Sequence, residues 1–470
     1  MEQQRSNPST APSISLSASA LAERQRFHGQ SYGKAVQPVR TLFGCEPMAQ
    51  IGPDAVFQDN EWCAALAAST PGQPLQAEGA SPGRTPAAAT AGPRLLAAAL
   101  EAVKVRRIAS NDRYVLHRAY PSPRGMFGVD VEASTGEGTV RIEPWGPYAT
   151  LLGTPAAADG HGLPVLRLRT RPGRFPAPYG TLRPSLALLE AGHLLATIGA
   201  AAFQVGLAPA VQFGCAPDEP PCADSGELAG SVRHCQDGLR KLSTSGPHAA
   251  AVIGPADHAV LVRLASGRKG NTMNAPGDVE QWFHRRSSGS SHANLVTSAP
   301  IPTAVEAQLD AVVAAGLAAV ARLLPDPTAL VVHRIKLEEN NMAFKSATRI
   351  THGPATGAQF VLDDSSEVPF SSALGYCWSV DFPAWERRYG SGTSAVLHSV
   401  LGWLCQWVCL AAAANMATAR PARNFDEAAW GCALRLRPTQ VPSYQVWLRP
   451  VAREEQRSGS WSTYGRKAWS

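Results

Sequence analysis

Two stretches of this sequence decide its fold: PAPYGTLRPSLALLEAGHLLATIGAAAFQVGLAP, residues 176–209, and WERRYGSGTSAVLHSVLGWLCQWVCLAAAANMATARP, residues 385–421. Each places Tyr-Gly shortly before a long Ala-rich run, and the periodicity of both runs predicts a helix. Gly192 and Gly402 each lie 13 residues after the tyrosine of their own stretch. This shared order indicates an internal duplication, so we expect two homologous halves in one chain.

Length and composition agree with that organisation. The chain has 470 residues, more than one hydrophobic core usually supports. Charged residues make up 17%, below the roughly 25% of typical soluble domains, and a large dry internal interface would explain the deficit. The net charge of +6 is too small and scattered for a nucleic-acid footprint. An acidic peptide is compatible with it.

The expected order is a disordered tail over residues 1–27, a first half over 28–266, a linker over 267–278 and a second half over 279–470. Pro/Gly/Ala-rich Thr70–Pro93 and Cys/Pro/Asp-rich Cys215–Cys235 predict surface loops. Further expected elements are helices over Ser185–Leu207 and Thr303–Leu324, and strands over Val129–Ala133, Thr139–Ile142, His258–Ser266, Thr328–Ile335 and Ser443–Pro450.

Nine cysteines without tight paired spacing favour a reducing cytoplasm over a disulfide framework. The N-terminus lacks the pattern of a secretory signal, and the apolar stretch from Val396 to Met416 predicts a buried core helix rather than a membrane span. Metal binding is not expected. Cys215, Cys222 and Cys235, with His234, lack CxxC pairing, and Cys405 and Cys409 predict core positions.

The strongest polar cluster is HRRSSGSS, residues 284–291. Arg285 and Arg286 offer planar charged donors, while Ser287 and its serine and glycine neighbours let the backbone approach anionic oxygens, a combination that suits a phosphate. A solvated linker is the alternative. Upstream, Ser122, Arg124 and Gly125 lie in a Pro/Gly-rich turn that leads into a strand. Such turns concentrate ligand contacts, although an ordinary turn has the same composition.

Tyr179 and Tyr389 could each place a phenol at a cavity rim, and Arg388 precedes the second. A phenol can transfer a proton if its neighbours lower its pKa; a half-buried packing role is the alternative. Glu190 and His193, three residues apart on one helix, face the same side and form either a site pair or a structural contact. The chain contains no GxGxxG after a strand, Walker lysine, HExxH or GxSxG, which removes the commonest nucleotide, protease and hydrolase interpretations.

Taken in order, these segments resemble one family. HRRSSGSSHANLVTSAPIPTAVEAQLDAVVAAGL is similar to the opening of nitroreductase-fold flavoproteins, where an Arg-x-Ser element holds the FMN phosphate. YPSPRGMFGVDVEAST, PWGPYATLLG and APYGTLRPSLALLEAGHLLATIG resemble the middle of SagB-type azoline dehydrogenases, with their Lys-Tyr-Gly element and Glu-Ala-Gly-His helix. The similarity covers most of residues 110–215 and 280–450.

The departures from the family pattern affect both halves. Pro178 and Arg388 replace the lysine of Lys-Tyr-Gly, so only the tyrosines carry over. Residues 28–266 lack a recognisable Arg-x-Ser opening, and the second helix has Val400 and Trp403 in place of glutamate and histidine. Each half is therefore incomplete by itself.

The resemblance implies an α+β nitroreductase-like fold whose halves form an intramolecular pseudo-dimer. Arg285, Arg286 and Ser287 would then face Ser122 and its turn across one composite FMN site. The implied activity is oxidation of thiazolines or oxazolines to azoles on a ribosomally made, thiopeptide-like precursor peptide, with Tyr389 or Tyr179 handling the proton and Arg388 stabilising the phenolate. A cyclodehydratase partner and further homo-oligomerisation fit the same resemblance. The alternatives are a flavin-dependent nitroreductase of small molecules and a peptide-binding pseudoenzyme.

Overall fold

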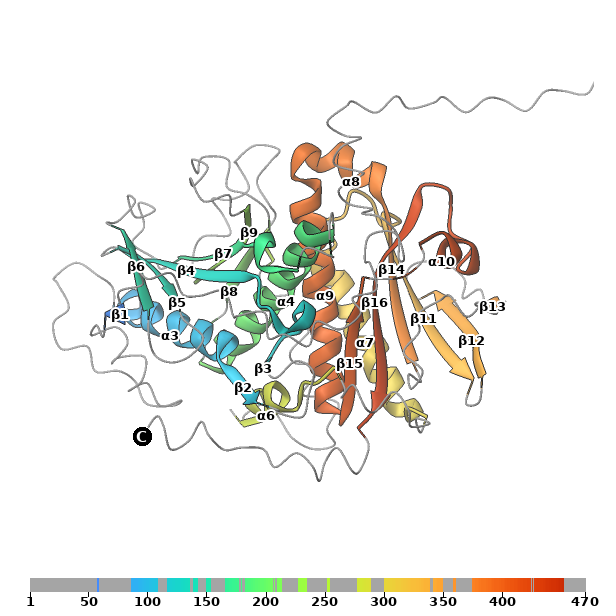
Figure 1. Ribbon diagram of the computed structural model, residues 1–470, viewed down its shortest axis with the longest axis horizontal. Helices are drawn as coiled ribbons and strands as arrows, with labels where there is room; N and C mark the ends of the chain where they lie inside the picture. The colour runs from blue at the N-terminus through green and yellow to red at the C-terminus, as the bar shows by residue number, and fades with distance from the viewer. Residues whose placement is uncertain are drawn as a thin grey trace, which may run out of the picture.

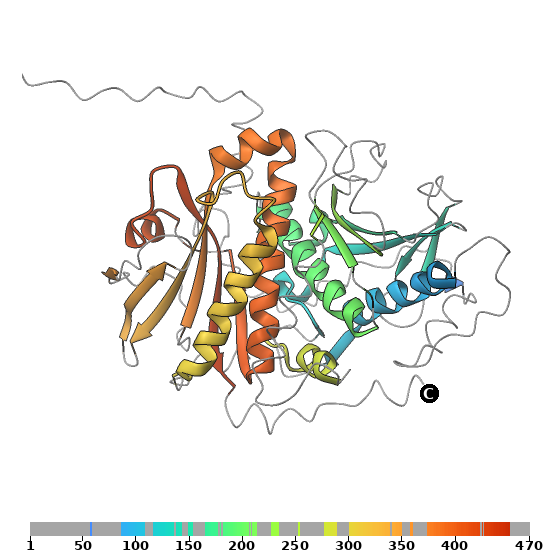
Figure 2. The same ribbon diagram turned by 180° about the vertical axis from the view of Figure 1, so that it is seen from behind.

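In the computed structural model, the chain forms two antiparallel sheets with long helices between them (Figures 1 and 2). The expected tail and the strand expected over His258–Ser266 lie outside the described residues. The structure describes residues 57–58, 86–108, 116–135, 138–142, 149–153, 165–176, 179, 182–205, 207, 209–213, 227–234, 252–253, 277–288, 300–338, 341–349, 358–360, 374–423, 425 and 427–451.

The first unit contains an eight-stranded sheet in the order β1-β6-β5-β4-β7-β9-β8-β10. Its strands are β1 (Phe57–Gln58), β4 (Val129–Thr135), β5 (Gly138–Ile142), β6 (Ala149–Gly153), β7 (Val165–Thr170), β8 (Pro209–Phe213), β9 (Glu227–His234) and β10 (Val252–Ile253). The remaining elements are helices α3 (Pro86–Val103) and α4 (Arg183–Gln204), the hairpin of β2 (Val105–Ile108) and β3 (Leu116–Arg118), and the short 3₁₀ turns η1 (Pro123–Gly125) and η2 (Pro172–Arg174).

The second unit contains a six-stranded sheet in the order β13-β12-β11-β14-β16-β15. Its strands are β11 (Leu330–Glu338), β12 (Asn341–Arg349), β13 (Ala358–Phe360), β14 (Leu374–Asp381), β15 (Ala417–Ala422) and β16 (Gln440–Pro450). Its helices are α6 (Gly277–Arg285), α7 (Thr303–Val320), α8 (Phe382–Tyr389), α9 (Thr393–Ala414) and α10 (Glu427–Ala433), with the 3₁₀ turn η7 (Gly390–Gly392) before α9.

The two sheets repeat one topology. Numbered along the chain, strands β4 to β9 lie in the order 3-2-1-4-6-5, and strands β11 to β16 lie in the same order. In each unit the long helix joins the fourth strand to the fifth, and α4 and α9 are both 22 residues long. The helices begin 210 positions apart, at Arg183 and Thr393. The duplicated sequence pattern therefore corresponds to a repeated topology.

Helices α4 and α9 pack directly against each other at the centre of the molecule (Figure 1). A Cβ built on Gly192 would meet the carbonyl oxygen of Ser399 at less than 3.0 Å, and one built on Gly402 would meet that of Leu189 just as closely. Gly192 and Ser399 are 207 residues apart, and Leu189 and Gly402 are 213 apart, which is three fewer and three more than the 210-residue offset. The two contacts are therefore equivalent under the repeat, as in an isologous interface. Only glycine allows the backbones this approach.

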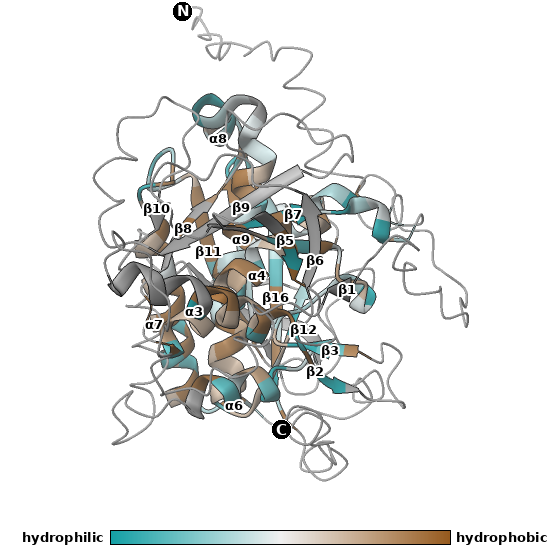
Figure 3. Cartoon of the chain, turned by 90° about the vertical axis from the view of Figure 1, so that its left-hand side faces the viewer, coloured by the Kyte–Doolittle hydropathy of each residue, from teal (hydrophilic) through white to brown (hydrophobic). Residues whose placement is uncertain are grey.

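One continuous hydrophobic core extends through both units. Its buried side chains include Leu188 and Leu195 of α4, Leu397 and Leu404 of α9, and Leu330 of β11. Figure 3 shows hydrophobic residues concentrated on the central helices, whereas α6 carries hydrophilic ones. This packing explains the low share of charged residues. Each unit buries its long helix against the other unit, so the helix needs no charged side chains to face water.

By length and composition alone, α4, α7 and α9 are each apolar enough to cross a membrane. The apolar window is 94% buried inside the protein in α4 and 100% buried in α9, but only 33% buried in α7. Packing inside the protein therefore accounts for the composition of α4 and α9, and the expectation of a buried helix over Val396–Met416 is confirmed for the residues in α9.

Two expected loops contain regular structure. Helix α3 begins at Pro86, inside the stretch Thr70–Pro93, because proline suits a first helical position and the alanines that follow favour helix. Strand β9 occupies Glu227–His234, inside Cys215–Cys235, where it pairs with β7 and β8. Tertiary pairing overrides the local composition there. Helix α6 also starts before the expected end of the linker, at Gly277.

Candidate functional site

Polar side chains gather where α4 meets α9, in an otherwise apolar contact between the units that we call the seam. The His193 ring on α4 lies 2.9 Å from the Gln406 side-chain oxygen through Nδ1 and 2.9 Å from the Tyr444 hydroxyl through Nε2. The amide of Gln406 donates to the Ala119 carbonyl and to Thr197 Oγ1. Hydrogen-bond donors and acceptors from both units therefore pair with one another in this buried network.

A second polar contact at the seam joins α4 to the turn after β3. Ser122 Oγ donates to Glu190 Oε2 at 2.6 Å and accepts from the Phe127 backbone N–H at 2.8 Å. Glu190 is fully buried, and its Oε1 atom has no hydrogen-bond partner among the described residues. Burial raises the pKa of this carboxyl to about 7, although the Ser122 hydrogen bond and the charge of Arg118 oppose the rise. Glu190 can therefore exchange a proton near neutral pH.

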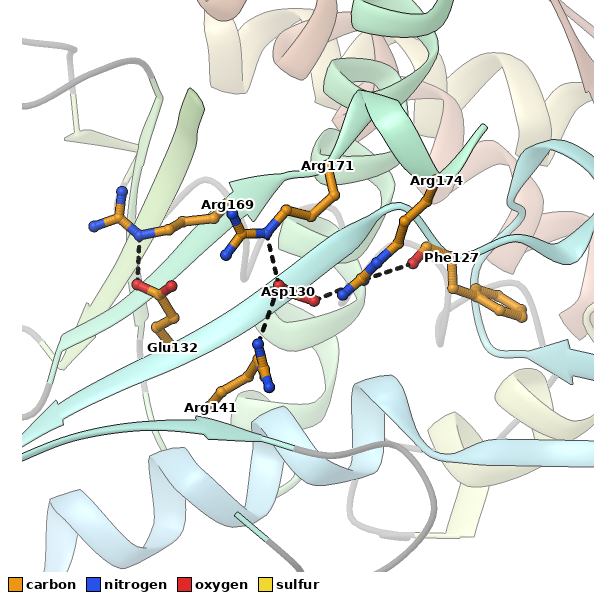
Figure 4. Close-up of polar contacts among 7 residues, drawn as sticks. All are labelled: Phe127, Asp130, Glu132, Arg141, Arg169, Arg171 and Arg174. Atoms are coloured by element: carbon orange, nitrogen blue, oxygen red, sulfur yellow. Dashed lines mark hydrogen bonds and ion pairs between the residues drawn. The ribbon is translucent and has the colours of Figure 1, made fainter. Parts of the chain in front are cut away.

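The turn that holds Ser122 has an unusual backbone. Arg124 and Phe127 have φ values of 54° and 50°, in the left-handed region that costs non-glycine residues about 1–3 kcal/mol. Arg174 stabilises this conformation because it donates to the Phe127 carbonyl at 3.2 Å and forms an ion pair with Asp130 at 2.7 Å (Figure 4). Such strain, held from several sides, is typical of functional turns.

Asp130 belongs to a row of ion pairs on the sheet face that is opposite to the core. Arg171 and Arg141 also approach its carboxylate, and on the same strands Arg169 pairs with Glu132 at 2.5 Å (Figure 4). These pairs join β4 to β5 and β7. They fix the strand that follows the Ser122 turn and thereby position the turn itself.

Buried guanidinium groups lie beside the seam. Arg286 is 5% exposed; its Nε donates to the Arg118 carbonyl at 3.1 Å and its Nη1 to Ser288 Oγ at 3.3 Å. The Arg118 guanidinium donates to the Tyr120 hydroxyl and lies 3.8 Å from the Phe127 ring centre. The Nε of Arg118 and the Nε and Nη1 of Arg106 have no hydrogen-bond partner among the described residues. Buried unbonded N–H donors of this kind suit an anionic group.

The structure brings some of the expected site residues together but not all. Arg286 donates to the backbone carbonyl of Arg118, which lies four residues before Ser122. This hydrogen bond links the Arg-x-Ser element to the strand that leads into the turn. Ser287 instead accepts a backbone hydrogen bond from Ala419, and Arg285 is partly exposed at the end of α6.

The two tyrosines have different surroundings. Tyr389 donates to the Leu323 carbonyl at 2.6 Å, and burial raises its pKa despite the neighbouring Arg388. Arg388 donates to the carbonyls of Arg322 and Leu324, so both side chains cap the chain just beyond α7. This arrangement keeps the phenol protonated, against the expected role of Arg388. Tyr179 instead lies under the Arg124 guanidinium, 5.2 Å from the ring centre, beside the strained turn.

Comparison with solved structures identifies this architecture. A candidate nitroreductase of Anabaena variabilis ATCC 29413 is similar to 92% of this chain and 99% of its own, with a TM-score of 0.61 at 11% sequence identity. The chain has a nitroreductase-like fold. A candidate nitroreductase of Ralstonia eutropha JMP134 also matches, over 39% of this chain and 86% of its own, with a TM-score of 0.30 and 12% identity. No family model and no curated protein sequence matches the chain.

The residues beside the seam fit the FMN that the resemblance implies. The unbonded Nε of Arg118 is buried, and Arg286 donates to the Arg118 carbonyl at 3.1 Å, whereas Arg106 already pairs with Glu101 at 2.9 Å. A phosphate would satisfy donors that this nitroreductase-like fold otherwise leaves unpaired at a cost of about 1–3 kcal/mol each.

Sequence patterns missed several residues of the seam. Gln406 and Tyr444 stand in apolar surroundings without a motif, and Arg118 lies in a short strand. Glu190 and His193 each make buried hydrogen bonds to other partners, which agrees with the structural alternative to a site pair. A buried polar residue in an otherwise apolar helix, as Gln406 is, was the available signal.

Proposed function

We propose that this chain is an FMN-dependent oxidoreductase built as a fused pseudo-dimer, with halves over residues 28–266 and 279–470 joined by 267–278. One composite cofactor site would lie at the seam. The observation that carries the proposal is the buried contact between Arg286 and Arg118, which joins the two units, together with the unbonded Nε of Arg118. The repeated strand order and the reciprocal glycine contacts support the pseudo-dimer.

The residues of the chain would divide the work of holding FMN. Arg285, Arg286 and Ser287, with Arg118, would hold the phosphate, because guanidinium groups form strong charge-assisted hydrogen bonds with it. Ser122, Arg124 and Gly125 would line the opposite side through the strained turn. Bound FMN would accept two electrons and a proton from the substrate.

We further propose that the substrate is an azoline on a ribosomally made, thiopeptide-like precursor peptide. The Glu-Ala-Gly-His helix after Tyr-Gly, residues 179–193, supports this choice. Conversion of an azoline to an azole removes a hydride equivalent and a proton from the ring. The cofactor would take the hydride, and the chain would supply the proton acceptor. A cyclodehydratase that forms the azoline is the expected partner, in a reducing cytoplasm.

The proton acceptor is more consistent with Tyr179 than with Tyr389. The Tyr389 hydroxyl is committed to a backbone carbonyl, whereas Tyr179 lies beside the turn, with the Arg124 guanidinium 5.2 Å from its ring centre. Glu190 lies behind the same turn, where it can hold a proton near neutral pH.

Mass spectrometry of a heterocyclised precursor peptide tests the proposal. The protein should remove two hydrogen masses per azoline. Arg285→Ala should lose FMN and activity but melt at the temperature of flavin-free wild type, since Arg285 is partly exposed. Loss of one charged phosphate partner costs about 1.5–3 kcal/mol of binding. Arg387→Ala, an exposed arginine on α8, is the matched control.

Two results would count against this function. If Arg285→Ala retains FMN, the Arg-x-Ser element is only a linker. If the protein reduces nitroaromatic compounds but leaves azolines unchanged, it is a small-molecule nitroreductase. A colourless protein that binds the precursor without changing its mass would be a peptide-binding pseudoenzyme.

A further inference from the structure

The seam contains a soft-ligand cluster that the flavin chemistry does not use. One ligand atom each from His193, Cys405 and Cys409 lie within 4.8 Å of one another, and all three residues are buried. The two cysteines are four residues apart on α9, which puts both thiols on one face, one turn apart. The sequence alone predicted these cysteines as core and predicted no metal.

The hydrogen bonds around His193 put its lone pair on Nε2, where a cation would take the place of the Tyr444 proton. The Gln406 amide nitrogen donates to the Ala119 carbonyl, so its oxygen must be the atom that faces Nδ1. Nδ1 therefore carries the ring proton and Nε2 carries the lone pair, which accepts from the Tyr444 hydroxyl. An oxygen that accepts the proton of the other ring nitrogen, and so fixes the tautomer, is typical of metal-binding histidines.

The cluster is not a requirement of the fold. At the equivalent positions, 210 residues earlier, α4 has Leu195 and Gly199 in place of the two cysteines. The histidine has no counterpart either, because Trp403 occupies its position on α9. Apolar residues thus serve the same packing in the other helix, and the soft ligands occur once, on one side of the pseudo-symmetry.

We propose that His193 Nε2 and the thiolates of Cys405 and Cys409 bind one thiophilic d¹⁰ cation, Zn²⁺ or Cu⁺, with the Tyr444 hydroxyl at hand as a fourth ligand. Two thiolates and an imidazole suit either ion. On binding, the cation would replace the two thiol protons.

The metal content of the full-length protein tests this site. We expect about one equivalent of Zn²⁺ or Cu⁺ per chain after expression in medium supplemented with each ion in turn and purification under reducing conditions. The double variant Cys405→Ala/Cys409→Ala should lose it. Cys377→Ala, a buried cysteine on β14 outside the cluster, should retain it. Comparison of the two media tells which ion the site prefers.

Two results would overturn the proposal: wild-type protein without stoichiometric metal from either medium, or equal metal in the double variant. The wild-type measurement remains decisive if the double variant fails to fold. Replacement with Cd²⁺ adds a spectroscopic readout, since thiolate-to-cadmium charge transfer should appear in wild type and in Cys377→Ala only. None of these readouts depends on flavin or on turnover, so the proposed oxidoreductase activity can fail independently.

Discussion

At the residue scale, the central feature is a carboxyl group that the fold buries without a full set of partners. Glu190 keeps one oxygen on Ser122 and leaves the other unbonded. The ionised form is costly in such surroundings, so the protonated and ionised forms of this carboxyl are both populated near pH 7. The Glu-Ala-Gly-His pattern marks this residue in the sequence, but its serine partner, 68 positions away, could not be predicted from spacing.

The raised pKa of Glu190 makes stability depend on pH. The folded protein holds this proton more tightly than the unfolded chain does, so the stabilising contribution is complete below about pH 4.5 and is lost as pH rises through about 7. Glu190→Gln should therefore flatten thermal stability between pH 5 and 8 and should stabilise the protein at pH 8 by roughly 3 kcal/mol at most. Melting temperatures across this range, with Glu386→Gln as control, would reject the idea if wild type and Glu190→Gln change in parallel.

We expect the two tyrosines to differ in what they contribute, one to the reaction rate and the other to stability. Tyr179→Phe is expected to slow azoline oxidation by ~10²–10⁴-fold, the usual contribution of a proton acceptor, with an unchanged flavin spectrum. Tyr389→Phe should leave the rate intact but lose about 0.5–1.5 kcal/mol of stability, because it removes the hydrogen bond to Leu323. If both variants oxidise the azoline at the wild-type rate, neither phenol is the proton acceptor.

At the element scale, α4 and α9 determine how the units meet. Their apolar composition all round predicts burial, and equal Tyr-Gly to glycine distances predict equivalent positions. The close approach of Gly192 to Gly402 could not be predicted, since it depends on the crossing of two helices that are far apart in sequence.

Alanine at either glycine should force the helices apart. Gly192→Ala and Gly402→Ala place a Cβ against backbone oxygens that cannot move aside, and overpacking of this kind costs about 1–3 kcal/mol or more. Both variants should melt earlier by similar amounts, because their contacts are reciprocal. Gly173→Ala, where nothing lies within 4 Å, should melt like wild type. A normal melting temperature for Gly192→Ala would show that the helices are farther apart than described.

At the scale of the whole molecule, two sheets of one topology share one large core, and polar residues from both units meet at the seam. The sequence predicted the repeat and the long helices. It did not predict the hydrogen-bonded link between Arg286 and Arg118 or the buried contacts of Gln406 and Tyr444, because these depend on how the units pack. Of the two long helices at the seam, α4 has the Glu-Ala-Gly-His sequence and α9 does not. The two repeats are therefore chemically different.

The number of flavins per chain tests this account most directly. FMN released from the denatured full-length protein, measured by absorbance against a protein concentration from amino-acid analysis, gives that number. A single composite site predicts about one FMN per chain, because Arg and Ser ligands come from one unit and the turn from the other. Two flavins per chain would contradict the composite site, and none would contradict the flavoenzyme itself.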